Sequence, residues 1–312
     1  MIKVDQIKDA HKRIRPYVIK TPTLISERLN KKFGASLFFK CENFQKTGSF
    51  KYRGAINTIE QLDEFELKKG IVTASSGNHG AALSKIAKDR HIPCSVIMPI
   101  DSSKTKVNNV QRNNGKIIWC DPNQTSREKT LRETISLTGA IPIHPYNDER
   151  IVAGQGTVAK ELIENQEDID SIICPVSGGG LLGGTLCYIK ETNPNVKVFG
   201  AEPKEADDTF RSLNEGKIIP NKTTNTICDG LRAQIGSITF PIIQKYVDDI
   251  ITISENDIIK SMRLIWDELK IIIEPSCAIT LAALERQRML FSGSKVGLVL
   301  SGGNVDLDNL PW

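Results

Sequence analysis

Residues 70–99 read GIVTASSGNHGAALSKIAKDRHIPCSVIMP and decide the fold class. The segments 70–74 and 94–99 are short β-rich runs. Between them, a cluster of turn residues leads into a stretch with helical spacing. The order strand, helix, strand is typical of a βαβ unit with parallel strands. This stretch therefore predicts an α/β protein.

The alternation of strand and helix continues on both sides of a cleft that we expect between two units. The first series has helices at 104–115 and 125–139 and strands at 116–120 and 140–144; the second has strands at 171–176, 196–202 and 295–303 and helices at 181–193, 257–273 and 278–290. We predict two doubly wound domains with mainly parallel sheets. The small domain spans 69–146. The large domain combines 147–312 with 1–68, because the N-terminal helix and strands need a sheet to join.

The composition is ordinary for a soluble globular protein of the size of an enzyme, and it argues against several other classes. The 312 residues are 39% hydrophobic and 25% charged, with a net charge of +4 that gives no case for nucleic-acid binding. The charged N-terminus does not resemble a signal peptide, and no apolar run is long enough to cross a bilayer. Seven scattered cysteines form no CxxC pair, so buried thiols in a reducing cytoplasm are expected.

Three glycine-containing turns follow predicted strands. PVSGGGLLGG (175–184) can direct several backbone N–H groups at one anion, at the start of a helix, or can be only a tight turn. We favour a phosphate site. The loop has neither the Gly-Lys-Ser/Thr of a Walker A motif nor the GxGxxG of a nicotinamide dehydrogenase. ASSGNHG (74–80) and VLSGGN (299–304) are the other two. Helix capping alone could explain the first, and a simple turn could explain the second.

A lysine in a short stretch of small and aromatic residues, QKTGSFKYRGA (45–55), completes a pattern with these turns. SFKYRGA, SSGNHG, SGGGLLGG and SGGN occur in this order, with HPYNDERIVAGQGT (144–157) and EPSCA (274–278). The combination resembles the fold type II (tryptophan synthase β-like) family of pyridoxal-phosphate (PLP) enzymes, and within it the serine racemase and serine/threonine dehydratase group. The resemblance runs from about residue 5 to the C-terminus.

The resemblance implies a role for each matching residue. Lys51 would bind the cofactor covalently, which requires a neutral amine and hence a lowered pKa. The other residues of the cofactor site would be Phe50, Asn78, Ser177, Gly178, Gly179, Gly180, Leu181, Gly230, Glu274 and Ser301. The residues around the substrate would be Ser75, Ser76, Asn78, His79 and Arg127.

The identity of residue 76 bears on the reaction. The resemblance implies a serine racemase that interconverts L- and D-serine and also eliminates serine to pyruvate and ammonia. Racemisation needs an acid/base on each face of the substrate, and Ser76 would stand opposite Lys51. Ser76 could instead only cap the following helix, without an acid/base role. A threonine or 3-hydroxyaspartate dehydratase with little racemisation stays open, because hydroxyaspartate dehydratases of the group also carry this serine. A non-catalytic amino-acid sensor is the rival from another class.

The resemblance also implies a divalent cation and a homodimer. AEPKEADD (201–208) matches the cation site of the group, with carboxylates from Glu202 and Asp208 and the carbonyl of Ala206. Such oxygen ligands suit Mg²⁺ or Ca²⁺, and Mn²⁺ is a further candidate. Activation by ATP stays open. Lys46 and Thr47 match the nucleotide-binding relatives, whereas Ala81 and Asn114 replace their glutamine and tyrosine.

Overall fold

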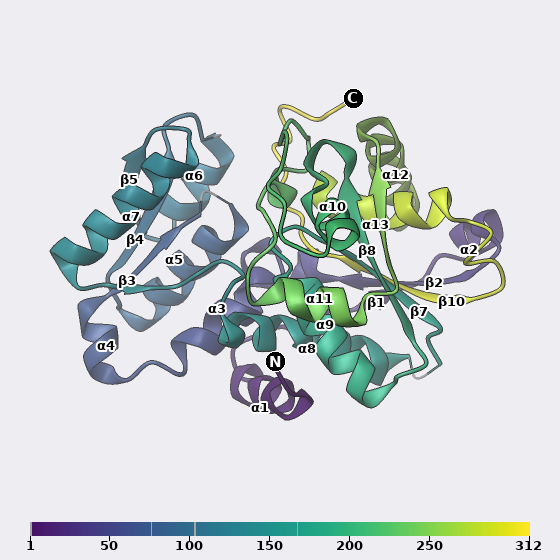
Figure 1. The fold of residues 1–312 in the computed structure, drawn as a ribbon, viewed down its shortest axis with the longest axis horizontal. Helices are drawn as coiled ribbons and strands as arrows, with labels where there is room; N and C mark the ends of the chain where they lie inside the picture. Colours follow the sequence, from purple (N-terminus) through teal and green to yellow (C-terminus); the bar gives the residue numbers. More distant parts are fainter. Residues whose placement is uncertain (1, 76, 103, 167) are drawn as a thin grey trace.

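The structure is a computed structural model that describes residues 2–75, 77–102, 104–166 and 168–312. These residues form a six-stranded and a four-stranded sheet, each with helices around it (Figure 1). The strands are β1 (Thr23–Leu24), β2 (Ser36–Cys41), β3 (Ile71–Ala74), β4 (Cys94–Pro99), β5 (Lys116–Cys120), β6 (Ile141–Pro142), β7 (Ser171–Pro175), β8 (Lys197–Pro203), β9 (Asp249–Ile253) and β10 (Lys295–Leu300).

The helices account for most of the remaining chain. The α-helices are α1 (Val4–Ile14), α2 (Glu27–Phe33), α3 (Lys51–Ile59), α4 (Glu64–Lys69), α5 (Asn78–Arg90), α6 (Lys104–Gln111), α7 (Gln124–Thr138), α8 (Glu149–Asn165), α9 (Gly180–Thr192), α10 (Asp208–Glu215), α11 (Thr239–Tyr246), α12 (Glu255–Leu269) and α13 (Pro275–Arg286). Short 3₁₀ helices are η1 (Glu42–Phe44), η2 (Lys46–Gly48), η3 (Lys204–Ala206) and η4 (Asp229–Leu231). None of the helices in the described ranges is long and apolar enough to span a membrane.

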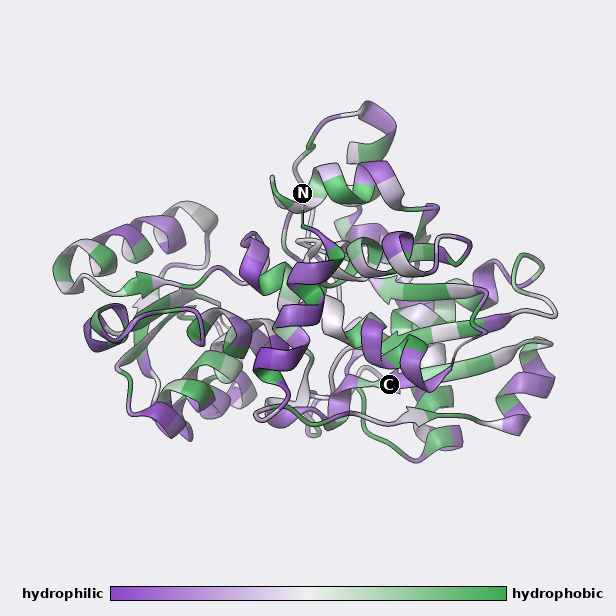
Figure 2. Cartoon of the chain, turned by 90° about the horizontal axis from the view of Figure 1, so that it is seen from below, coloured by the Kyte–Doolittle hydropathy of each residue, from purple (hydrophilic) through white to green (hydrophobic). Residues whose placement is uncertain are grey.

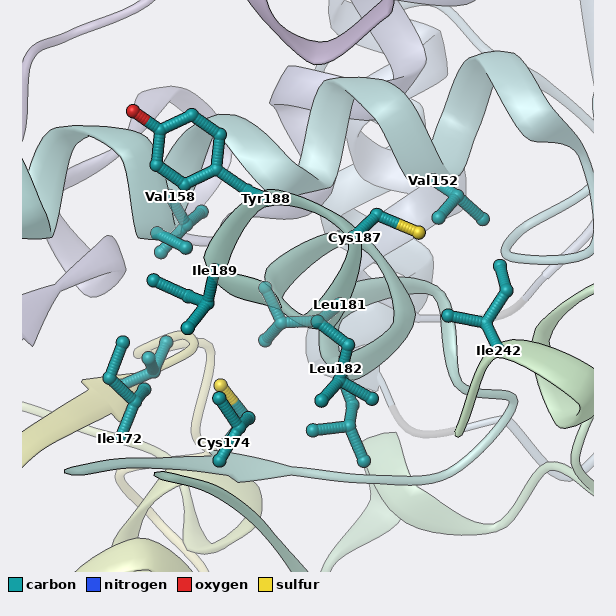
Figure 3. Close-up of a cluster of buried hydrophobic side chains, with 14 of the residues drawn as sticks. Val152, Val158, Ile172, Cys174, Leu181, Leu182, Cys187, Tyr188, Ile189 and Ile242 are labelled. Atoms are coloured by element: carbon teal, nitrogen blue, oxygen red, sulfur yellow. The ribbon is translucent and has the colours of Figure 1, made fainter. Parts of the chain in front are cut away.

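The larger sheet has the order β1-β2-β10-β7-β8-β9 and is parallel except for the β1–β2 pair. Its central strands are almost continuously apolar, as expected for a parallel sheet that is covered by helices on both faces. Figure 2 shows these hydrophobic strands surrounded by helices with hydrophilic residues. One core lies between this sheet and α8, α9 and α11, and part of it is drawn in Figure 3. A second core lies on the other face, under α2, α12 and α13.

The smaller sheet is wholly parallel and has the order β5-β4-β3-β6. The predicted βαβ unit is its centre, since β3, α5 and β4 follow one another as expected from residues 70–99. All four strands lie within 69–146, and all six strands of the larger sheet lie outside this range. This distribution supports the predicted domain limits, which stay a proposal. α3 lies between the two sheets, because Tyr52, Ala55 and Ile56 pack into the core of the smaller one.

Several elements are shorter than the sequence predicted. The helix predicted at 104–115 ends at Gln111, and the strand predicted at 295–303 ends at Leu300. Two further differences bear on the cleft. The helix predicted at 257–273 ends at Leu269, because Lys270 adopts a left-handed conformation with φ of 54°. The residues after it lead back to Glu274 beside the cleft. The strand predicted at 140–144 pairs only at Ile141 and Pro142, so the residues after it are free to form a loop.

The strand order defines where the carboxyl-end turns converge. In the smaller sheet, β4 and β5 follow β3 on one side, and β6 then pairs with β3 on the other side. In the larger sheet, β8 and β9 follow β7 on one side, and β10 pairs with β7 on the other. Open parallel sheets bind ligands at such switch points, beside the carboxyl ends of the strands. The turns after β3, β7 and β10 are ASSGNHG, PVSGGGLLGG and VLSGGN, so all three glycine-containing turns lie at these points.

Candidate active site

A cleft of about 1770 Å³ lies between the two sheets and is lined by residues from both. Every residue that the sequence assigned to the cofactor or the substrate, and that the structure describes, lines this cleft: Phe50, Lys51, Ser75, Asn78, His79, Arg127, Ser177, Gly178, Gly179, Gly180, Leu181, Gly230, Glu274 and Ser301. Ser76 lies outside the described residues. The predicted cation ligands do not line the cleft and form a separate cluster.

Lys51 is the first residue of α3 and its amine is held inside the cleft. Its Nζ donates a hydrogen bond to the carbonyl of Pro145 over 2.9 Å and lies 5.2 Å from the centroid of the Phe50 ring. Burial lowers the pKa of Lys51 to about 8, although the charge of Glu274 raises it. A lysine with this pKa has a much larger neutral fraction near pH 7 than a surface lysine. It can therefore act as a nucleophile or a base.

The glycine loop, residues 177–181, joins β7 to α9 and presents N–H groups at the helix start. Gly179 is left-handed with φ of 86°, which a glycine adopts without strain. Among the described residues, the N–H groups of Gly178 and Gly179 have no hydrogen-bond acceptor, and the first N–H groups of an α-helix have none within the helix. A Cβ on Gly178 would lie 2.3 Å from the Tyr146 ring, so the loop packs too closely on Tyr146 for a side chain. The loop therefore suits an anion such as a phosphate.

Hydrogen bonds from two neighbouring segments fix this loop. Ser177 Oγ donates to the Ala233 carbonyl and accepts from the Ala233 N–H, both over 2.9 Å. Thr239 Oγ1 donates to the Gly178 carbonyl over 2.7 Å. The side chain of Ser177 thus has a structural role, while its position in the loop leaves its backbone N–H near the predicted anion.

A polar network ties α5, beside the smaller sheet, to α13, beside the larger one. Asn78 Nδ2 donates to both carboxyl oxygens of Glu274, over 2.9 and 3.2 Å. Asn304 Nδ2 donates to Asn78 Oδ1 over 2.8 Å, and the Asn304 N–H donates to Glu274 Oε2 over 3.2 Å. Burial and the charge of Asp229 raise the pKa of Glu274 to about 8, against the effect of these hydrogen bonds. The sequence singled out Asn78 and Glu274 but gave no role to Asn304.

Two residues assigned to the substrate have buried polar atoms without a partner among the described residues: a donor on Arg127 and an acceptor on His79. Arg127 Nε is a buried donor that lacks a partner among the described residues. His79 Nε2 lies 3.3 Å from the Ile143 carbonyl, whereas its buried Nδ1 has no described partner. Burial, with the charge of Lys51, lowers the pKa of His79 to about 3, so the ring is neutral. A guanidinium without a carboxylate partner suits a substrate carboxylate.

Ser301 follows β10 and is buried at the inner end of the cleft. Its carbonyl accepts the N–H of Phe50 over 3.1 Å, which places the turn directly beside Lys51. Gly230 lies in η4, where its N–H donates to Ser276 Oγ over 3.0 Å. A neutral hydroxyl at position 301 suits the nitrogen of a pyridine ring, which is the role that the resemblance implies for Ser301.

Sequence reasoning assigned no role to many other residues of the cleft, and four of them contribute to its geometry or charge. Three of them, His144, Pro145 and Tyr146, form one loop. The Pro145 carbonyl accepts the hydrogen bond from Lys51, and Tyr146 packs on the glycine loop. His144 Nδ1 accepts the N–H of Asn147 over 2.8 Å, which holds this loop in shape. The segment begins the motif HPYNDERIVAGQGT. Its available signal was a proline with an aromatic ring on each side. Asp229 was the fourth, and no local pattern marks it.

The predicted cation ligands form a buried acidic pair. Glu202 and Asp208 are 0% and 1% exposed. Glu202 accepts the N–H groups of Thr209 and Phe210, and Asp208 Oδ2 accepts the N–H of Ile235. Asp208 Oδ1 is buried and has no partner among the described residues. Burial and the charge of Asp208 raise the pKa of Glu202 to about 8, and burial raises that of Asp208 to about 6. An unpaired buried oxygen in such a pair fits a cation.

Comparisons with known proteins agree with this geometry. The family model described as "Pyridoxal-phosphate dependent enzyme" matches residues 14–302. Serine racemase of Arabidopsis thaliana is 48% identical over 97% of this chain and 93% of its own. A β-hydroxyaspartate dehydratase of Paracoccus denitrificans is 44% identical over 97% and 96%. The structure of maize serine racemase is 44% identical, covers 98% of this chain and 95% of its own, and superposes with a TM-score of 0.96. The chain therefore belongs to the family of pyridoxal-phosphate dependent enzymes, with the fold type II architecture.

Proposed function

We propose that this enzyme is a serine racemase that interconverts L- and D-serine and also converts serine to pyruvate and ammonia. The observation that carries the proposal is the position of Lys51. Its amine, with a pKa of about 8, lies in the cleft that also contains the glycine loop. The similarity to serine racemases at 48% identity supports the choice of substrate.

The described residues fit pyridoxal phosphate at both ends. The glycine loop would hold the phosphate through N–H groups, Ser301 would meet the ring nitrogen, and Phe50 would pack on the ring. Asn78 would bind the ring hydroxyl, with Glu274 and Gly230 beside it. When bound, the cofactor supplies an electron sink that weakens the Cα–H bond of an amino acid. Lys51 Nζ then takes or returns the proton on one face.

The substrate would be oriented by groups from the smaller sheet. We propose that Arg127, with Ser75, Asn78 and His79, binds the carboxylate, because Arg127 Nε is a buried donor that has no partner among the residues the structure describes. The ring of His79 is neutral, so it adds no charge beside the carboxylate. Ser76 would exchange the proton on the face opposite Lys51, a role that rests on the sequence alone.

Chiral analysis of the products from L-serine tests this proposal. The wild type should yield D-serine and pyruvate. Lys51→Ala should abolish both, and Ser76→Ala should remove racemisation while it spares elimination. If both activities survive in Ser76→Ala unchanged, the assignment of Ser76 is wrong.

A β-hydroxyaspartate dehydratase is the second candidate, because the relative from Paracoccus denitrificans is 44% identical. The reaction would then remove the β-hydroxyl of 3-hydroxyaspartate and release oxaloacetate and ammonia. Oxaloacetate from that substrate, together with an absence of D-serine from L-serine, would favour this candidate. The two compounds should be compared at equal concentration with one preparation of the enzyme.

We propose a divalent cation, Mg²⁺ or Ca²⁺, at Glu202, Asp208 and the carbonyl of Ala206. The support is the unpaired Asp208 Oδ1 in a buried acidic pair. Added Mg²⁺ or Ca²⁺ should raise the thermal unfolding temperature of the wild type and not that of Asp208→Asn. Glu205→Gln, on the exposed side of the same segment, is the matched control and should respond like the wild type. An equal response of Asp208→Asn would contradict the site.

The homodimer and the cytoplasmic location that the resemblance implies are proposals of the same kind. Sedimentation velocity of the purified protein would test the first. ATP as an effector is open, and a titration of activity with ATP would decide it.

A further inference from the structure

Helix α8 lies between the two helices that carry the ends of the cofactor site. Lys51 is the first residue of α3, and the glycine loop ends in the first turn of α9. α8 packs against both helices, and Figure 1 shows α8 and α9 together beneath the larger sheet. The distance between the amine of Lys51 and the glycine loop therefore depends on how closely α8 approaches each neighbour.

The contact between α3 and α8 is made by backbone. A Cβ on Gly154 would lie 2.6 Å from the Cα of Gly54, and a Cβ on Gly54 would lie 2.8 Å from the Ile151 carbonyl oxygen. Gln155 adds a hydrogen bond, since its Oε1 accepts the N–H of Gly54 over 3.2 Å. An added methyl group at this contact must move one helix away from the other, because backbone atoms cannot turn aside as side chains do.

The contact between α8 and α9 is equally close. A Cβ on Gly184 would lie 2.4 Å from the Val152 carbonyl oxygen, and a Cβ on Gly156 would lie 2.8 Å from the Gly184 carbonyl oxygen. The adjacent Gly183 differs, because a Cβ there would come no closer than 3.8 Å to its neighbours. The side chains of α9 around this contact, among them Leu181 and Leu182, are buried against the larger sheet (Figure 3).

A buried ion pair holds α3 to α8 from the side away from the cleft. Arg53 donates to both carboxyl oxygens of Glu161 on α8, over 2.7 and 2.8 Å. It also donates to both oxygens of Glu42, each over 2.8 Å. All three side chains are almost fully buried. Side chains two positions apart on an α-helix point in directions that differ by about 200°, so Arg53 faces α8 while Lys51 faces the cleft.

We propose that α8 sets the separation between Lys51 and the glycine loop, with Gly154, Gly184 and Arg53 as positioning residues. The inference rests on the proposed roles of Lys51 and the loop. A cofactor held at both ends gains affinity because the second attachment is intramolecular. That gain requires a span that allows both attachments at once. A misplacement of about 1 Å can cost about 100-fold in the reactivity of two positioned groups, here the amine of Lys51 and the aldehyde. A Cβ on Gly184 would have to move at least about 0.6 Å to reach 3.0 Å from the Val152 carbonyl oxygen, and this shift should cost at least about tenfold.

Three probes separate the span from its two ends. Pyridoxal phosphate uses both attachments, pyridoxine 5′-phosphate has no aldehyde and uses only the loop, and pyridoxal has no phosphate and uses only Lys51. Affinities are measured on the full chain after removal of the cofactor. Gly184→Ala should weaken pyridoxal phosphate at least about tenfold and change each single-attachment probe less than about threefold. Gly183→Ala is the matched control on the same helix and should bind all three like the wild type.

Two results would overturn the inference. One is an equal loss for pyridoxal phosphate and pyridoxine 5′-phosphate in Gly184→Ala, which would place the damage in the loop. The other is identical behaviour of Gly184→Ala and Gly183→Ala. If Gly184→Ala does not fold, Arg53→Lys takes its place, since it keeps the charge but loses the paired hydrogen bonds; it should show the same selective loss.

The wild type distinguishes this inference from the proposed function. A covalent link between lysine and the cofactor absorbs near about 410–420 nm because of the cofactor chromophore. Absence of this band from the wild type would refute the proposed role of Lys51. Presence of the band, with no selective loss in the variants, would refute only the role of α8.

Discussion

Two opposing influences set the pKa of Lys51, on which its proposed reactivity depends. Burial lowers the pKa of the amine to about 8, and the charge of Glu274 raises it. Burial and the charge of Asp229 in turn raise the pKa of the Glu274 carboxyl to about 8. Each group therefore carries its charge less readily than it would in water.

The uptake of pyridoxal phosphate by the cofactor-free protein should follow the ionisation of Lys51. Only the neutral amine attacks an aldehyde, and the neutral fraction grows as the pH rises through the pKa. The rate should therefore increase with pH and reach half of its maximum near pH 8. An unperturbed lysine would give a midpoint near about 10.4. Stopped-flow absorbance measures the rate, and the pH dependence of pyridoxine 5′-phosphate binding corrects for ionisation of the phosphate.

Glu274→Gln should move this midpoint below pH 8. The carboxylate stabilises the ammonium form of Lys51, so its loss removes the influence that raises the pKa and leaves burial unopposed. Glu285→Gln, near the other end of α13 and exposed, is the control and should leave the midpoint unchanged. A midpoint that rises in Glu274→Gln would mean that the sign of this interaction is wrong.

At the scale of the elements, α3 is anchored by charges that have no access to water. Arg53 stands between the carboxylates of Glu42 and Glu161, and Lys40 Nζ donates to Glu161 over 2.7 Å. Thr21 Oγ1 donates to Glu42 as well. Because every member is paired, the group joins α3, β2 and α8 without an uncompensated buried charge.

Arg53→Met should lower the free energy of unfolding by about 3–5 kcal/mol, because it leaves buried carboxylates without their main partner. Lys85→Met removes a partly exposed pair with Asp89 within α5, and should cost no more than about 0.5 kcal/mol. Urea unfolding followed by circular dichroism gives both values. A loss below about 1 kcal/mol for Arg53→Met would show that α3 is held by packing alone.

The elements themselves were largely predictable, whereas the contacts between distant segments were not. β3, α5, β4 and the glycine loop follow from local patterns of apolar and turn residues. The insertion of β10 between β2 and β7 has no local signature, because it depends on which apolar strand finds the open edge. Lys51 was marked by its motif, but its acceptor at Pro145 and the link of Asn78 to Asn304 join residues 94 and 226 positions apart.

At the scale of the whole molecule, polar contacts connect the two groups of elements on either side of the cleft. One is the network of Asn78, Glu274 and Asn304. Another is the ion pair between Lys106 on α6 and Asp229 in η4, with Nζ and Oδ2 3.0 Å apart. Both side chains of this pair line the cleft and are partly exposed. The pair therefore draws the smaller sheet towards the larger one across the cleft.

Lys106→Gln should weaken this attraction and raise the KM for L-serine by about 1.5- to 5-fold, which corresponds to about 0.2–1 kcal/mol for a partly exposed pair. The pair acts on Lys51 only through Glu274, whose pKa Asp229 raises and Lys106 lowers, so kcat should change less than KM. Salt screens partly exposed charges, and the KM of the wild type should rise towards that of the variant as ionic strength increases. Lys104→Gln, an exposed position on the same helix, is the matched control. A KM of Lys106→Gln equal to that of Lys104→Gln at low salt would show that the two halves of the cleft are held by the Asn78 network and by apolar packing of α3 alone.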